Sequence, residues 1–200
     1  MEDGETDDPL AVLRSRSDEY RAVSIPVAWT GGVLSVILSA WIVLVLPHIG
    51  AEAFFWLWLV VYLVVDLANT VFLRIRAAQS GRDFVTESTV YAIGKMMPGY
   101  LVGAVAGPSY VFLFDDPVAA AAGMTLGAGV LLWGTRRFAP RGLFYLGVFW
   151  LLAAAGWWTW HQMGGTIESM SPVAQGAVVM GTNFGGGLLV YAALAQTQVR

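Results

Sequence analysis

Two ionisable residues lie inside stretches of this 200-residue chain that are otherwise hydrophobic enough to cross a lipid bilayer. Asp66 stands in the run YLVVDLANT, and Lys95, the only lysine, stands in the run GKMMPG. A charge at membrane depth costs free energy unless it has a partner or a function, so both residues are candidates for a functional site.

The surroundings of Asp66 have helical periodicity. Tyr62, Asp66, Asn69 and Thr70 follow i, i+4, i+7 and i+8 spacing, so on a helix they share one polar face that should point into a bundle or a wet cavity. Counting about 1.5 Å per residue puts Asp66 roughly 20 Å from the outer end of its segment and Lys95 roughly 10 Å from the inner end of the next. In a hydrocarbon core of about 30 Å the depths nearly match, so a direct ion pair is sterically reasonable.

Three interpretations of the two charges stay open. They form a salt bridge that fixes the register of two helices, or they belong to a polar transport or permeation site. Alternatively they are unpaired, and the long side chain of Lys95 extends toward the cytoplasmic surface.

Further residues extend the transport interpretation. Pro98 removes an amide donor inside one apolar segment, and a glycine triplet follows Asn183 in another. Broken helices bind ions and substrates in many transporters, although a kink can also serve packing alone. The predicted polar site comprises Asp66, Lys95, Asn69, Tyr62, Thr70 and Asn183, and the predicted hinges comprise Pro98, Gly99, Gly185, Gly186 and Gly187.

Other kinds of chemistry find little support. His48 and His161 are expected at the outer boundary on the same side as Glu52, Asp115, Asp116 and Glu168, where imidazole and carboxylate groups could bind a metal or sense pH. The sequence has no metal-ligand spacing such as HExxH, no phosphate-binding glycine motif, no GxSxG and no cysteine. We therefore expect neither a metal, nor a cofactor, nor an enzyme.

The composition indicates the fold class. The chain is 57% hydrophobic and 12% charged with a mean hydropathy of +0.64, which excludes an ordinary water-soluble domain. Residues 1–23 read as an acidic cytoplasmic tail with an optional amphipathic helix at the membrane surface. Residues 24–200 read as one all-α bundle of six transmembrane helices. The expected spans are 24–46, 53–73, 88–114, 118–133, 142–160 and 172–195.

The arginines predict orientation. In a six-helix arrangement all ten fall on one side, and the loops on the other side contain no Lys or Arg. The positive-inside rule then places both termini in the cytoplasm, and the location would be the cytoplasmic (inner) membrane. The ten are Arg14, Arg16, Arg21, Arg74, Arg76, Arg82, Arg136, Arg137, Arg141 and Arg200.

Small and aromatic residues add packing signals. Gly99, Gly103 and Gly107 recur every four residues, a spacing that lets helix backbones approach closely, within one bundle or between two copies. Tryptophans such as Trp157 and Trp160 are expected at the outer membrane boundary, as an interfacial belt or around a ligand pocket.

The resulting functional hypothesis is a small transporter or channel-like protein with a buried polar site at Asp66 and Lys95. The alternative is a non-catalytic membrane subunit: a scaffold, a lipid- or pigment-associated protein, or the substrate-binding subunit of a transporter. Expected partners are the lipid bilayer, a second copy or other membrane proteins, and an unidentified small molecule or ion. No basic patch argues for nucleic acid.

Overall fold

The computed structural model describes the backbone of residues 24–81, 83 and 87–197, and this part of the chain is all-helical. Six of its helical stretches are long and apolar enough to span a membrane, which confirms the expected six-helix fold of an integral, multi-pass membrane protein. The predicted acidic tail, residues 1–23, lies outside the described residues.

The helices follow the expected spans closely. They are α2 (Ile25–Val45), α3 (Ala51–Gln79), α4 (Glu87–Phe114), α5 (Pro117–Gly134), α6 (Arg141–Gln162), α7 (Pro172–Met180), a π-helix η1 (Gly181–Gly186) and α8 (Gly187–Thr197). The sixth span is thus α7, η1 and α8 in succession. The largest departure is at α3, which continues six residues beyond the expected end at Leu73. The added residues are Arg, Ile, Ala and Gln, most of them good helix formers, so the helix persists after its apolar run ends.

Helix starts have local causes. Proline occupies the first turn of α2, α5 and α7, where its missing N–H has no intrahelical partner to lose. The Asp116 carboxylate accepts hydrogen bonds from the amides of Val118 and Ala119 at the start of α5. The Ser171 hydroxyl accepts one from the amide of Ala174 in α7. These caps satisfy backbone donors that the first helical turn leaves open.

Glycines allow the central helices to approach closely. A Cβ atom added at Gly127 of α5 would lie 2.5 Å from the Cα of Gly103 in α4, and one at Gly99 would lie 2.3 Å from the backbone nitrogen of Leu131. Gly32 of α2 packs in the same way against Leu189 and the carbonyl of Gly185. These small-residue faces thus pack within one bundle, which is one of the two arrangements expected from the sequence.

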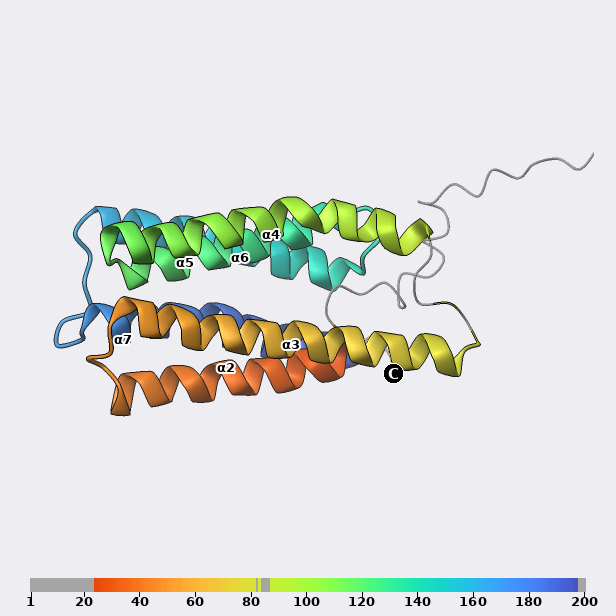
Figure 1. Ribbon diagram of the computed structural model, residues 1–200, viewed down its shortest axis with the longest axis horizontal. Coiled ribbons are helices and arrows are strands. Elements are labelled where there is room, and N and C mark those ends of the chain that lie inside the picture. Colours follow the sequence, from red (N-terminus) through yellow and green to blue (C-terminus); the bar gives the residue numbers. More distant parts are fainter. Residues whose placement is uncertain (1–23, 82, 84–86, 198–200) are drawn as a thin grey trace, which may run out of the picture.

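The helices are buried to very different extents. The structure buries 67% of the apolar window in α5 and 61% in the α7–α8 span, but 11% in α3 and 17% in α4. Figure 1 shows α4, α5 and α6 running together on one side of the molecule and α2 and α3 on the other. It also shows α3 and α4 continuing past the other helices at one end. The two peripheral helices, α3 and α4, carry the two charges singled out in the sequence.

The two ends of the bundle differ in charge. Because the six spans alternate in direction, all the described arginines lie at one end, called the arginine end below: Arg74, Arg76, Arg136, Arg137 and Arg141. The opposite end, called the histidine end, holds His48 and His161.

Candidate functional site between α3 and α4

Asp66 and Tyr100 join the two peripheral helices. The Tyr100 hydroxyl donates a hydrogen bond of 3.1 Å to Oδ1 of Asp66. Asp66 lies about 22 Å along α3 from its start at Ala51, within the membrane-spanning window, and both side chains are exposed on the surface of the single chain. The carboxylate therefore has a polar partner from the neighbouring helix, but it is not sealed inside protein.

Lys95 is the second predicted charge, and it lies elsewhere. Its ammonium group sits 5.0 Å from the centre of the Tyr91 ring, which is one turn nearer the arginine end. Its backbone carbonyl contacts Gly134, the last residue of α5. Among the described side chains, Asp116 and His161 form a direct polar contact, but Asp66 and Lys95 do not form an ion pair.

The positions of Lys95 and Tyr100 along α4 explain why Lys95 does not reach Asp66. Lys95 precedes Tyr100 by five residues, so it lies about 7–8 Å further toward the arginine end than the residue that binds Asp66. Lys95 is also level with the end of α5, whereas counting from segment ends alone had placed it deeper. Its direction toward Tyr91 matches the interpretation in which an unpaired lysine extends toward the membrane surface.

The contact between α3 and α4 is closed at one end only. Near the histidine end, Phe54, Phe55 and Trp58 of α3 are buried, and the ring of Phe55 lies 5.7 Å from that of Phe112 in α4. Beyond Trp58, Asn69 alone among the α3 residues is buried. We call the region from Leu59 to the arginine end, between α3 and α4, the seam.

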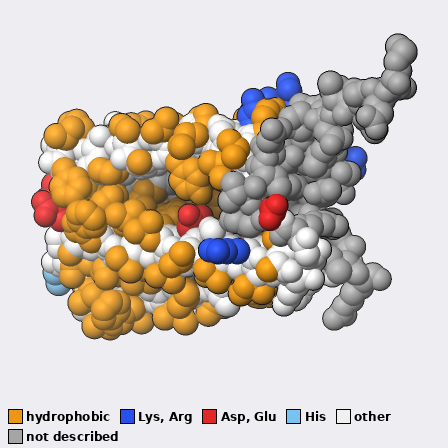
Figure 2. Space-filling view, turned by 45° about the vertical axis from the view of Figure 1, so that its right-hand side comes forward, with side chains coloured by type: hydrophobic (Ala, Val, Ile, Leu, Met, Phe, Trp, Pro, Cys, Tyr) orange, Lys and Arg blue, Asp and Glu red, His pale blue; other side chains and the backbone are white. Residues whose placement is uncertain are grey.

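The face that carries α3 and α4 is largely apolar. Figure 2 shows hydrophobic side chains over much of the described surface in this view, with an acidic side chain in the hollow where the upper and lower helices meet and a basic side chain close to it. The exposed apolar residues of α3 and α4 in this part of the two helices include Val60, Leu63, Val64, Leu67, Val71, Ile93, Met97, Leu101 and Val105. An ionisable group in such surroundings is the feature that sets the seam apart from the rest of the surface.

A chain of aromatic contacts leads from the seam into the core. The ring of Tyr62, one helical turn from Asp66, lies 4.7 Å from Phe184, whose ring lies 4.8 Å from Trp150. The Tyr62 hydroxyl is buried and has no hydrogen-bond partner among the described residues. It is therefore a free polar group one turn away from the Asp66 carboxylate.

Phe184 belongs to the π-helix η1, which lies where the sequence suggested a hinge. The Trp150 indole N–H donates a 2.7 Å hydrogen bond to the carbonyl of Asn183, and the Asn183 side-chain amide donates to the hydroxyl of Thr125 at 3.4 Å. All three residues are buried. Single π turns inside α-helices occur frequently at functional sites. Whether η1 moves stays a prediction.

The other predicted residues have separate positions. Oδ1 of Asn69 accepts a 2.9 Å hydrogen bond from the amide of Ser24, so Asn69 ties the start of α2 to α3. Thr70 is exposed beside it. α4 runs through Pro98 without a break, and Gly99 is a packing position against α5. Gly185 and Gly187 are also packing positions, whereas nothing lies within 4 Å of a Cβ atom added at Gly186.

The histidine end contains a polar contact of a different kind. Nε2 of His161 lies 2.7 Å from Oδ2 of Asp116, and Oδ1 of the same carboxylate caps α5. His48 is exposed. Throughout the described ranges, no three His, Asp or Glu residues lie close enough together to hold a metal ion. The imidazole and carboxylate singled out in the sequence thus join α6 to the α4–α5 connection.

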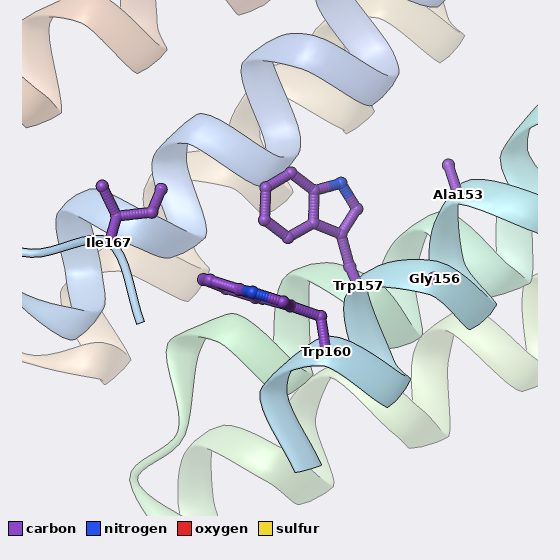
Figure 3. Close-up of a pocket in the computed structure, with 5 residues that line it drawn as sticks. All are labelled: Ala153, Gly156, Trp157, Trp160 and Ile167. Carbon is purple, nitrogen blue, oxygen red and sulfur yellow. The ribbon is translucent and has the colours of Figure 1, made fainter. Parts of the chain in front are cut away.

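Two tryptophans line an open pocket near this end. Trp157 and Trp160 of α6 lie with their ring centres 5.3 Å apart and their planes at 85°, and Ile167 closes the other side (Figure 3). The pocket has a volume of about 390 Å³, and Ala153 and Gly156 complete its lining. Ligand sites usually add a few polar groups that fix orientation, and this lining supplies almost none. The seam is therefore the stronger candidate site.

Sequence reasoning missed Tyr100, Thr125 and Trp150. No periodic pattern marks them, because Tyr100 follows a glycine packing face and Trp150 lies in a run of aromatic residues. Comparison with known protein families, curated proteins and solved structures finds no significant match to the chain.

Proposed function

We propose that the protein is a small membrane transporter whose substrate site is the seam between α3 and α4. The observation that carries the proposal is the Asp66–Tyr100 hydrogen bond across two helices that otherwise make little contact in this region. Asp66 would bind the substrate, and the hydroxyls of Tyr100 and Tyr62 would orient it.

The packing of α3 supports movement of this helix. Its aromatic end is anchored by Phe54, Phe55 and Trp58. The described contacts of the longer remainder include those of Asn69 and Tyr62, the packing of Val65 against Gly31, and the hydrogen bond to Tyr100. A helix that is fixed at one end and lightly packed elsewhere can tilt at low cost, because few buried apolar contacts have to break. Tilting of α3 would separate Asp66 from Tyr100 and expose the site to alternate sides.

The π-helix would transmit this movement to the core. Tyr62 of α3 contacts Phe184 of η1, and the adjacent Asn183 is held by Trp150 and Thr125. Asn183 would thus act as a support for the site from the interior. Lys95, level with the end of α5, would lie at the entrance from the arginine end.

We also propose that the arginine end faces the cytoplasm and that the protein resides in the cytoplasmic membrane. The described arginines lie at one end of the bundle. Two helical spans separate one arginine-bearing connection from the next, so the chain crosses the bundle twice and returns to the same end. Retention of Lys and Arg on the cytoplasmic side during insertion favours this orientation for short connections.

The absence of cysteine from the chain allows a direct test. Asp66→Cys would be treated, in sealed vesicles of known orientation, with a membrane-impermeant thiol reagent added to one side at a time. A transport site reaches both compartments in turn, so modification is expected from either side. Leu152→Cys is the control, because this residue is exposed on the middle part of α6, away from the seam, and has no predicted role.

Two results would contradict the proposal. If Asp66→Cys reacts with reagent from neither side, the seam faces only lipid or protein. Reaction from one side only would describe a vestibule and not a transport path. Single cysteines at Arg76 and His48 would report which end of the bundle faces the cytoplasm.

The alternative of a non-catalytic subunit has one observation in its favour. The α3 and α4 windows are 11% and 17% buried, so both helices offer long apolar faces to the membrane. Transmembrane helices of a partner protein could pack there, with Asp66 as a polar contact. Copurification of the native protein in mild detergent, with mass spectrometry of the bound proteins, tests this; a stable partner that protects Asp66→Cys from reagent would replace the transport proposal.

A further inference from the structure

We infer that the seam binds amphipathic organic cations, which reach Asp66 sideways from the membrane. The inference rests on the proposed function, because it names the substrate class of the same site. Its basis is a single carboxylate, Asp66, that is surrounded by apolar side chains of α3 and α4.

The charge balance at Asp66 favours a cation. Its contact among the described residues is the hydroxyl of Tyr100, which is a neutral donor. Lys95 is directed toward Tyr91, and Arg74 lies two helical turns further along α3. A carboxylate in surroundings of low polarity gains strongly from a cationic partner, and no described basic side chain contacts it.

The available ligands favour an organic cation over a metal ion. Hard metal cations require about six oxygen ligands, whereas the seam offers the Asp66 carboxylate and the Tyr100 hydroxyl, because the Tyr62 hydroxyl is buried. The described residues contain no cluster of acidic or imidazole groups at this position. A substituted ammonium or phosphonium group carries its charge in an apolar shell, so one carboxylate and the faces of tyrosine rings can hold it.

The shape and exposure of the site favour an amphipathic molecule. Leu63 and Leu67 of α3 and Leu101 of α4 are each at least 60% exposed, and they lie within one or two turns of the charged contact. An apolar substituent of the ligand could rest on these side chains and gain about 25 cal/mol for each Å² buried. Because the seam opens on the side of the bundle, such a ligand would enter from the acyl-chain region.

The test uses two probes of nearly the same size and opposite charge, tetraphenylphosphonium and tetraphenylborate. Binding would be measured by equilibrium dialysis against purified protein in detergent micelles, with empty micelles subtracted. We expect saturable binding of one tetraphenylphosphonium per chain, and no saturable binding of tetraphenylborate.

Substitutions of Asp66 and Glu52 test whether the cation binds at Asp66. Asp66→Asn keeps an oxygen that can accept from Tyr100, so the fold should survive, while affinity for tetraphenylphosphonium should fall at least tenfold. Asp66→Glu should retain part of the affinity. Glu52→Gln removes an exposed carboxylate at the other end of the same helix, and it should bind like the unmodified protein.

The outcomes separate this inference from the proposed function. Equal binding of the anion and the cation, or full affinity in Asp66→Asn, would overturn the inference that the site selects cations. If cation binding fails while Asp66→Cys reacts from both sides, transport survives and the substrate class is wrong. If the cation binds but Asp66→Cys reacts from one side or neither, the site is real and transport is wrong.

Discussion

Replacement of Gly127 by alanine is the sharpest test of the packing between α4 and α5. A Cβ atom at this position would lie 2.5 Å from the Cα and 2.6 Å from the nitrogen of Gly103, and 3.0 Å from the carbonyl oxygen of Gly99. All three contacts are with backbone, so no side chain can rotate away. The two helices would have to separate by about 1 Å to reach ordinary van der Waals distance.

The reciprocal substitution provides the control. A Cβ atom at Gly103 would lie 3.7 Å from the Cα of Gly127, an ordinary contact. Gly103→Ala should therefore be neutral or stabilising by up to about 1 kcal/mol, because alanine has the higher helix propensity. Gly127→Ala gains the same propensity but should lose about 1–3 kcal/mol through overpacking, so it should be the less stable of the two.

Thermal unfolding in detergent, followed by circular dichroism or by size-exclusion chromatography after heating, would measure the difference. For a chain of this size, 1 kcal/mol corresponds to about 2–4 °C, so Gly127→Ala should lower the midpoint by up to about 10 °C. Equal midpoints for Gly103→Ala and Gly127→Ala, or a higher midpoint for Gly127→Ala, would refute the proposed contact between the two backbones.

Substitutions at three further contacts have defined outcomes in the same unfolding assay. Trp150→Phe removes the indole N–H that Asn183 accepts and should destabilise the protein by about 1–3 kcal/mol, whereas a midpoint within error of the unmodified protein would contradict that hydrogen bond. Asp116→Ala should cost more than His161→Ala, because it loses both the α5 cap, worth about 0.5–2 kcal/mol, and the partly exposed contact with His161, worth about 0.2–1 kcal/mol; the reverse order would show that the cap is unimportant. Asn69→Ala should cost about 1–3 kcal/mol by leaving the buried amide at the start of α2 without its acceptor, and rescue of stability by Asn69→Asp would show that the acceptor is what matters.

The hydrophobic spans could be predicted from the sequence because their signal is local. Each span is a run of apolar residues about as long as the bilayer is thick, and the connections that carry arginines alternate with connections that contain no Lys or Arg. The continuation of α3 to Gln79 had no apolar signal, since helix propensity alone extends it.

The partners of each helix face could be predicted only in part. The glycines of α4 at residues 99, 103 and 107 indicated a close contact, but a run of small residues does not encode which helix fills it. Asp66 illustrates the same limit, because a match of depth between two charges does not specify their side-chain directions. The structure directs Lys95 to Tyr91 and supplies Tyr100, a residue with no periodic signature, as the partner of Asp66.

The π-helix has a consequence for the rotational phase of the sixth span. A π turn contains about one residue more than an α turn, so the helix after it is rotated by about 100° relative to an uninterrupted α-helix. This offset lets α7 present one face to α5 while α8 presents another to α6, and both keep contact with α2. Deletion of Gly186, where an added Cβ atom would meet nothing within 4 Å, would restore the α-helical phase and turn the Tyr191 ring away from the core. The two halves of the last span thus behave as two differently oriented surfaces joined in one continuous helix.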